Sequence, residues 1–179
     1  MEEMFDVLNE YGEFTGKIAS REECHKIGLW HRAVYAFIID KDKNVLLQKR
    51  SDKKKLWPNM WDVTLGGHVI KGEFGRQALI REAKEELGIN VTDNEIKYLI
   101  GSTSSNIKGD IINKHYNECY LITKSIDLAK LKLQKEEVAE VKYFSKNELL
   151  KRILNNYEGL TQKTGAWNFL ERILDSYIV

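Results

Sequence analysis

The chain has 179 residues, 42% of them hydrophobic, which is enough for one globular domain with a sizeable core. Its 28 Lys and Arg residues nearly balance 27 Asp and Glu residues, and a net charge of +1 favours neither a nucleic-acid nor a membrane partner. The longest apolar run, residues 34–39, is too short to span a bilayer. Two cysteines make no disulfide framework and the acidic N-terminus lacks the order of a signal peptide, so we expect a cytoplasmic protein.

The first third of the chain predicts strands and one short helix. Residues 4–18 read as two short strands around a turn. Ser20 and Glu23 have the spacing of a capping box, which begins a short helix. Composition and turn signals then predict three strands: residues 32–39, 45–50 and 61–65.

The last part of the chain predicts more strands and then two helices. Three strands are predicted: residues 95–102, 116–123 and 137–144. Residues 102–114 read as a polar loop that would help to set substrate choice. Ser145 and Glu148 form a second capping box that opens a helix, and an amphipathic pattern predicts a final helix over residues 166–177.

A glycine-bounded segment, residues 67–89, lies between these two parts. Its sequence is GHVIKGEFGRQALIREAKEELGI. Apolar residues recur at offsets of one, three and four, as in a helix with a buried stripe: Leu79, Ile80, Ala83 and Leu87. Gly88 is a natural helix stop, and the loop around Gly67 lets the backbone approach a ligand closely.

Acidic side chains in this segment predict a cation site. Glu82, Glu85 and Glu86 stand at i, i+3 and i+4, where like charges repel by roughly a few tenths of a kcal/mol per pair. Carboxylates without thiolate or imidazole suit a hard cation, Mg²⁺ or Mn²⁺, which binds readily together with substrate phosphates. Arg81 is expected to brace the preceding loop by pairing with Glu73 at the start of the helix.

The segment resembles the Nudix box, in which Gly, Glu, Arg-Glu, Glu-Glu and Gly recur at fixed spacing, and every specified position is filled here. The resemblance implies a mixed β-sheet held between helices, with the box as a loop–helix–loop, which agrees with the α/β (α+β) class suggested by the elements. We expect one domain over residues 1–179, with residues 1–30 packed on it and helices in 145–179. The resemblance to the Nudix box implies a catalytic set of Glu85, Glu86, Arg81 and Glu73, and a metal set of Glu82, Glu85 and Glu86.

The resemblance extends to one branch of that family, the proteins related to isopentenyl-diphosphate isomerase. The matching positions are Trp57-Pro58, Trp61-Asp62 and Gly66-Gly67-His68, with His25 and His31 ahead of the first long strand. In such isomerases the metal set resembles His25, His31, His68 and Glu118, so His115 lies outside it. Gly66 stands where the isomerase has its catalytic cysteine, and Tyr116 where it has a second glutamate. Without the thiol one of two proton-transfer partners is missing, so the hydrolase reading is preferred.

The implied activity is cleavage of a diphosphate linkage in a nucleoside diphosphate linked to some moiety X, with Mg²⁺ or Mn²⁺ as cofactor. Two alternatives stay open: an isopentenyl-diphosphate isomerase, and a Nudix module that binds a nucleotide without cutting it. The general base is also open between Glu85 and a loop carboxylate. Substrate contacts are expected from Arg50, Lys49, Gly67, His68, Glu118 and Glu137. The partner is a small-molecule diphosphate, and the resemblance leaves a homodimer open.

Overall fold

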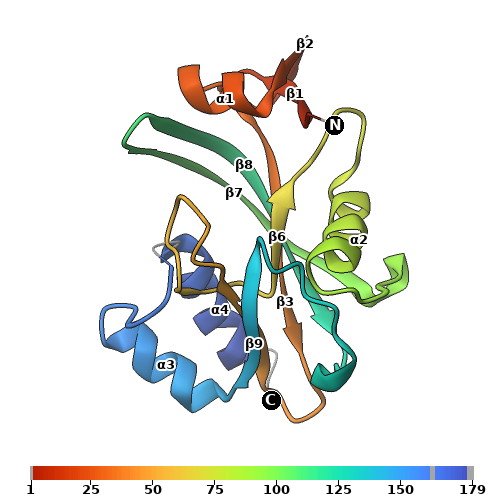
Figure 1. Cartoon of the computed structure of the whole chain (residues 1–179), viewed down its shortest axis with the longest axis vertical. Coiled ribbons are helices and arrows are strands. Elements are labelled where there is room, and N and C mark those ends of the chain that lie inside the picture. The colour runs from red at the N-terminus through yellow and green to blue at the C-terminus, as the bar shows by residue number, and fades with distance from the viewer. Residues whose placement is uncertain (1, 162–163, 177–179) are drawn as a thin grey trace.

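The computed structural model describes residues 2–161 and 164–176. Figure 1 shows helices on both sides of the central strands. The elements are β1 (Met4–Leu8), β2 (Phe14–Ser20), α1 (Arg21–Ile27), β3 (His31–Ile39), β4 (Val45–Arg50), β5 (Trp61–Asp62), β6 (Leu65–His68), α2 (Gly75–Glu86), β7 (Ile96–Lys108), β8 (Ile111–Thr123), β9 (Val138–Phe144), α3 (Lys146–Leu154) and α4 (Thr164–Ser176).

A mixed sheet forms the centre of the fold. In the described part of the chain it has seven strands in the order β5-β4-β3-β8-β7, with β6 beside β3 and β9 beside β4. β3 and β8 run parallel, which sets His31 opposite His115 and Val34 opposite Glu118. Because side chains alternate along a strand, these two pairs point to opposite faces of the sheet.

Helices cover both faces of this sheet. The core cluster on one face joins α2 to the strands and includes Ala36, Ile38, Leu79 and Ala83. The cluster on the other face joins α3 and α4 to the strands and includes Phe37, Leu149, Trp167 and Leu170. The predicted α+β architecture, a mixed sheet between helices, is therefore confirmed (Figure 1).

β1, β2 and α1 form what we call the N-terminal unit, which lies at one end of the sheet (Figure 1). β1 and β2 pair with each other in a separate two-stranded sheet, as the hairpin prediction expected. Ser20 caps α1 as predicted, because its hydroxyl accepts from the Glu23 backbone N–H at 3.2 Å. The unit has its own small core of Phe5, Val7, Ala19 and Cys24. Ser145 caps α3 in the same way.

The loop predicted over residues 102–114 is much too long, although its centre near Gly109 is correct. β7 continues to Lys108 and β8 begins at Ile111, so only Gly109 and Asp110 connect them. Polar side chains pair across this hairpin, for example Asn117 with Ser104 at 3.0 Å. Cross-strand hydrogen bonds of this kind stabilise extended strands that lack the apolar alternation by which strands are recognised.

Two other boundaries differ from the prediction. The strand expected at 61–65 is interrupted, with β5 ending at Asp62 and β6 beginning at Leu65. The final helix begins at Thr164, and the predicted end at Tyr177 lies outside the described residues.

Within the residues that the structure describes, no helix is long and apolar enough to cross a membrane.

Candidate active site

α2 presents the acidic face of the glycine-bounded segment. Its buried stripe holds the helix against the sheet, and Gly88 takes a φ of +69° just past the last turn, as the predicted helix stop requires. Glu73 stands one residue before the N-cap Phe74, so it belongs to the preceding loop and not to the first turn. The helix therefore carries the three later glutamates, while Glu73 reaches them from the loop.

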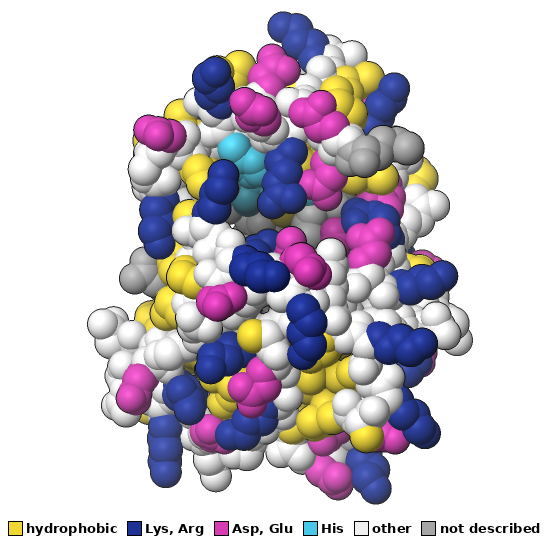
Figure 2. Space-filling view, in the orientation of Figure 1, with side chains coloured by type: hydrophobic (Ala, Val, Ile, Leu, Met, Phe, Trp, Pro, Cys, Tyr) yellow, Lys and Arg dark blue, Asp and Glu magenta, His cyan; other side chains and the backbone are white. Residues whose placement is uncertain are grey.

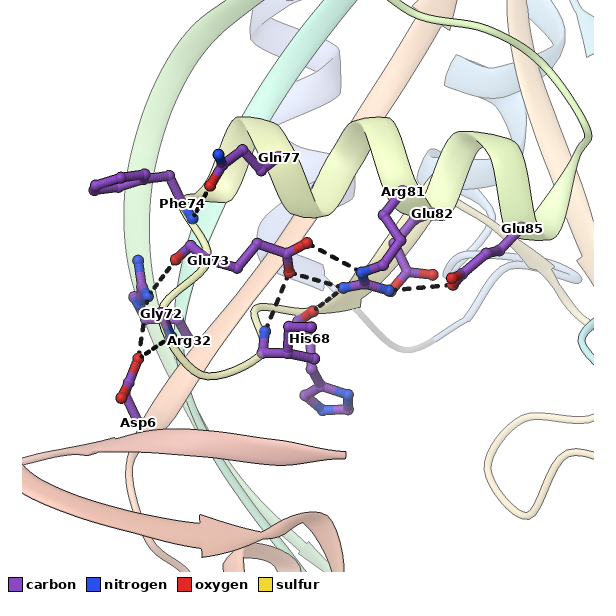
Figure 3. Close-up of polar contacts among 11 residues, drawn as sticks. Asp6, Arg32, His68, Gly72, Glu73, Phe74, Gln77, Arg81, Glu82 and Glu85 are labelled. Carbon is purple, nitrogen blue, oxygen red and sulfur yellow. Dashed lines mark hydrogen bonds and ion pairs between the residues drawn. The ribbon is translucent and has the colours of Figure 1, made fainter. Parts of the chain in front are cut away.

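Arg81 is the centre of the polar network on this face (Figure 3). It donates to both carboxylate oxygens of Glu73, from Nε at 3.1 Å and from Nη2 at 3.0 Å. Its Nη1 donates to Glu82 at 2.7 Å and to Glu85 at 3.2 Å, and Nη2 also donates to the His68 carbonyl at 2.9 Å. The predicted pairing of Arg81 with Glu73 is confirmed, and the same guanidinium orients two of the helix carboxylates.

The three helix glutamates have different surroundings. Glu82 and Glu86 are buried, whereas the Glu85 side chain is half exposed. Burial raises the pKa of Glu82 to about 7, although the Arg81 charge opposes this. Burial and then the charge of Glu82 raise the pKa of Glu86 to about 8. Two buried carboxylates side by side are costly unless a proton or a cation neutralises them, so this face is suited to a cation.

Gly67 explains how Glu82 reaches the strand. A Cβ at Gly67 would lie 2.0 Å from Glu82 Oε1 and 2.2 Å from its Cδ. No side chain fits there, so the glycine lets the carboxylate approach the β6 backbone. Its neighbour His68 contributes its carbonyl to Arg81, while its ring points to the opposite side of β6.

Three contacting residues were missed by the sequence reasoning. Gln48 on β4 donates from Nε2 to Glu86 at 3.2 Å. Arg32 on β3 donates to the Glu73 carbonyl at 2.7 Å, and Asp6 accepts from the Gly72 N–H at 2.8 Å (Figure 3). Gln48 had a signal, because an amide beside a continuously apolar strand is a candidate buried polar group. Arg32 and Asp6 had no such signal in the sequence, because only the pairing of distant strands brings them to the loop before α2.

The two predicted phosphate contacts on β4 have different surroundings. Alternation places Lys49 on the same face as Leu47, which packs in the α3 and α4 cluster and not beside α2. Arg50 donates to Asp62 at 2.9 Å and to the Leu56 carbonyl at 3.0 Å, so it holds the loop between β4 and β5. Their contact with a substrate phosphate stays a prediction.

The other two predicted carboxylates are also placed differently from each other. The charge of Glu137 contributes to the raised pKa of Glu86, after burial and Glu82, so it lies within electrostatic reach of the helix carboxylates, and it forms an ion pair with Lys54. Glu118 instead accepts from the Tyr120 hydroxyl and lies where a Cβ at Gly75 would stand, 2.2 Å from its Oε2. Glu118 thus lies at the beginning of α2, about two helical turns before Glu82.

A second cluster lies on the opposite face of β3 and β6. It consists of His25, His31, His68 and His115, whose candidate ligand atoms all lie within 4.8 Å of one another. Burial lowers the pKa of His25, His31 and His68, that of His31 to about 4, so these rings are neutral at neutral pH. The set implied by the isomerase resemblance therefore differs from the structure, which joins His115 to the other three histidines and turns Glu118 to the other face.

Comparison with known proteins agrees with the fold and with this site. The model of the NUDIX domain matches residues 29–163. A Nudix hydrolase of Listeria monocytogenes is 37% identical over 147 residues, covering 82% of each chain. Nudix hydrolase 3 of Arabidopsis thaliana is 39% identical over 147 residues, which is 79% of this chain but only 19% of that protein. The chain belongs to the NUDIX family. It is an enzyme of the Nudix hydrolase type, a class that acts on pyrophosphate-containing substrates and generally uses divalent metals.

Two further comparisons refine this placement. An isopentenyl-diphosphate Delta-isomerase of Halobacterium salinarum is 41% identical over 78 residues, 43% of this chain and 36% of that one, which is consistent with the branch suggested by the sequence. The crystal structure of DR0079 from Deinococcus radiodurans superposes with a TM-score of 0.71 at 21% identity, covering 93% of this chain and 98% of that one. The second likeness confirms the Nudix fold.

Proposed function

We propose that the protein is a Mg²⁺- or Mn²⁺-dependent hydrolase that cleaves the diphosphate linkage of a nucleoside diphosphate linked to a moiety X. The observation that carries this proposal is the carboxylate face of α2. Glu82 and Glu86 are buried there with raised pKa values, and Arg81 holds Glu82 and Glu85 in place. Such a face is suited to bind a divalent ion together with substrate phosphates.

The donor atoms fit a hard cation. All three helix ligands are carboxylates, and the buried Glu86 accepts from two neutral donors, Gln48 Nε2 and the Gly66 N–H. A bound ion would supply Lewis acidity to the diphosphate oxygens and to the attacking water. Arg81 keeps Glu82 and Glu85 oriented toward one another, and a bidentate pair with Glu73 fixes Arg81 itself.

Two carboxylates are candidates to accept the proton of the attacking water. Glu85 has its side chain 52% exposed, so it can meet water and substrate directly. Glu137 lies across the site on the loop before β9, where Lys54 contacts its carboxylate. We propose that one of these two is the general base, because each is close to the buried pair and neither is as deeply enclosed.

The test is a phosphate-release screen with purified protein. Nucleoside triphosphates, sugar nucleotides, dinucleotides and isopentenyl diphosphate are each incubated with Mg²⁺ and with Mn²⁺. We expect cleavage of one nucleotide class, lost in Glu86→Gln and kept in Glu140→Gln, which changes an exposed glutamate of β9. Tight nucleotide binding without turnover would instead support a non-catalytic module.

Isopentenyl-diphosphate isomerisation is the second candidate, favoured by the match to the Halobacterium enzyme. Gly66 disfavours it, because the position that aligns with the isomerase's catalytic cysteine has no side chain to transfer a proton. Conversion of isopentenyl to dimethylallyl diphosphate in the same screen would reverse our preference.

The contact of Asp6 with the loop leads to a prediction. Asp6 accepts from the Gly72 N–H and lies 3.8 Å from Arg32, which in turn holds the Glu73 carbonyl. Asp6→Ala should loosen this support and weaken Mg²⁺ binding about tenfold, the lower range for residues that orient metal ligands. The measurement is the Mg²⁺ concentration for half-maximal rate. Asp110→Ala, in the β7–β8 turn, is the control, and an unchanged Mg²⁺ requirement in Asp6→Ala would contradict the prediction.

We also propose a cytoplasmic location. Both cysteines, Cys24 and Cys119, are free and buried, and burial raises the pKa of each thiol. Free buried thiols are common in proteins of reducing compartments.

A further inference from the structure

A cavity of about 400 Å³ lies outside the carboxylate face, between the N-terminal unit and the β7–β8 hairpin. Its volume falls in the range of about 300–1,000 Å³ that is typical of small-molecule pockets. Val34, which pairs with Glu118, packs in the α2 cluster, so the cavity lies on the α2 face of the sheet. Its wall includes Gly12, Arg32, Gly101, Thr103, Tyr116 and Glu118.

The cavity is separate from the histidine cluster and from the carboxylate face. Arg32 follows His31 by one position on β3, so its side chain points to the opposite face of the sheet. Histidine reaches the surface elsewhere, in a hollow between Lys and Arg side chains (Figure 2). Glu118 lies about two helical turns before Glu82, so a ligand in the cavity is not at the proposed metal site.

Gly101 keeps this space open. It pairs with Glu118 across β7 and β8, and a Cβ at Gly101 would lie 2.9 Å from the hydroxyl of the half-exposed Tyr98. At the other end of the cavity, the Tyr116 hydroxyl donates to the Glu10 carbonyl in the turn between β1 and β2. The hairpin and the N-terminal unit therefore both hold the walls in place, as in a preformed ligand pocket.

Arg32 is the positively charged group of the wall. Its guanidinium carbon lies 5.2 Å from the centroid of the Phe14 ring, and its Nη2 donates to the Glu73 carbonyl at 2.7 Å and lies 3.8 Å from the Asp6 carboxylate. These contacts fix the plane of the guanidinium and leave the donors on Nε and Nη1 for a ligand. A planar pair of donors that is already held in place suits a carboxylate.

Glu118 is the negatively charged group of the wall. Its Oε2 accepts from the Tyr120 hydroxyl and would lie 2.2 Å from a Cβ at Gly75, so this oxygen is enclosed by β8 and α2. The other oxygen, Oε1, is left for a ligand. Within the described part of the chain, no lysine or arginine forms an ion pair with Glu118. A half-buried carboxylate without a counter-ion favours a ligand that carries a positive charge.

An α-amino acid carries the two charges that this cavity complements. Arg32 lies opposite Tyr116, and Glu118 is two positions further along β8, so the guanidinium and the carboxylate share one face. The ion-pair partner of Arg32 is Asp6 and not Glu118, so a ligand can lie between the two charges. Its carboxylate would accept from Arg32 and its ammonium group would donate to Glu118, both in charge-assisted hydrogen bonds. Leu8 and the Tyr116 ring provide an apolar wall for its side chain.

We propose that this cavity is a regulatory site for an α-amino acid with an apolar side chain, whose carboxylate binds Arg32 and whose ammonium group binds Glu118. Binding does not depend on the proposed hydrolase reaction. Arg32 links the cavity to the loop before α2, because the same guanidinium holds the Glu73 carbonyl. A bound carboxylate restricts Arg32 further and so stabilises the loop from which Glu73 reaches Arg81.

The first experiment measures binding to the full chain by isothermal titration calorimetry in EDTA. The probes are L-leucine, L-methionine and L-phenylalanine, each with its N-acetyl derivative and its amide, and the four common ribonucleosides. We expect at least one amino acid to bind, and loss of either charge, by acetylation or by amidation, to weaken its binding about tenfold or more. Absence of amino-acid binding at millimolar concentration, equal binding of the uncharged derivatives, or binding of a nucleoside in their place would overturn the proposal.

Two variants locate the binding site. Glu118→Gln keeps the shape of the side chain, so it should weaken binding of the amino acid about tenfold but leave the affinity for its N-acetyl derivative unchanged. Gly101→Val should fill the cavity and abolish binding, and it tests the site even if Glu118→Gln fails to fold. Ser105→Val, which changes an exposed residue on the same face of β7 outside the cavity, is the control. Wild-type affinity in folded Gly101→Val would contradict the location.

Hydrogen exchange tests the link to the loop before α2, again in EDTA and without any measurement of activity. The backbone N–H groups of Lys71, Gly72 and Glu73 donate to Met4, Asp6 and Ile70, so their exchange reports how firmly the loop is held. A saturating amino acid should slow exchange in residues 71–73 about twofold or more, and leave the distant β7–β8 turn at residues 109–110 unchanged. Binding without this protection would overturn the regulatory role.

Discussion

The Glu86→Gln variant is expected to lose hydrolase activity and, without divalent metal, to be more stable than the wild-type protein at alkaline pH. Glutamine keeps the shape of the side chain and can still accept from Gln48 Nε2 and the Gly66 N–H. It cannot supply a negative charge to a cation. Loss of that ligand removes several kcal/mol of charge stabilisation, which corresponds to a fall in kcat/KM of about 10²–10⁴-fold.

The stability effect follows from the pKa of Glu86. Burial raises this pKa to about 8, whereas the unfolded chain releases the proton near the ordinary value of 4.5. Between these values the folded protein binds more protons than the unfolded chain, so its free energy of unfolding falls as pH rises. The variant has no such group. We therefore expect similar stability at pH about 5 and a gain on the order of 1–3 kcal/mol for the variant at pH about 9.

Thermal unfolding in EDTA at both pH values measures this difference, with the exposed Glu140→Gln as control. Mg²⁺ should reverse the order, because it binds the folded wild-type protein and raises its Tm while having less effect on the variant. A Glu86→Gln variant whose advantage is the same at low and high pH would show that the carboxyl is not held protonated by burial.

Local spacing explains why so much of the carboxylate site was predictable. Glu73, Arg81 and the helix glutamates lie within fourteen positions, 73–86. Helix geometry therefore sets Arg81 beside Glu82 and Glu85, and the short loop before α2 brings Glu73 to the same guanidinium. The helix caps at Ser20 and Ser145 are local in the same sense. In each case the pattern and the structure depend on residues that are neighbours in sequence.

The histidine cluster could not be predicted in the same way. His115 joins His31 only because β8 pairs in parallel with β3 in this register. A shift of one residue would instead bring Tyr116 and Glu118 to the face that now carries the histidines. A resemblance supplies ligand types but not this register. The polar strands of the β7–β8 hairpin were misread for a related reason, since their cross-strand partners are not visible in sequence order.

Gly67→Ala should be strongly damaging, although it adds only a methyl group. Its Cβ would stand 2.0 Å from Oε1, 2.2 Å from Cδ and 2.7 Å from Cγ of Glu82, so rotation of the terminal carboxylate alone cannot relieve the contact. Glu82 must move away from its 2.7 Å contact with Arg81. We expect kcat/KM to fall about 10²–10³-fold through the displaced carboxylate, and stability to fall by about 1–3 kcal/mol through overpacking.

A double-mutant cycle tests whether Glu82 is the cause. In a Glu82→Ala background the clashing atoms are gone, so adding Gly67→Ala should cost less than about 0.5 kcal/mol in urea unfolding. Gly101→Ala is the stability control, because its Cβ would meet only the hydroxyl of the half-exposed Tyr98 within 3.4 Å. If Gly67→Ala costs the same stability with and without the Glu82 side chain, the backbone of β6 and not the carboxylate requires the glycine. If the cost disappears, Gly67 and Glu82 act as a pair, in which the missing side chain of one makes room for the carboxylate of the other.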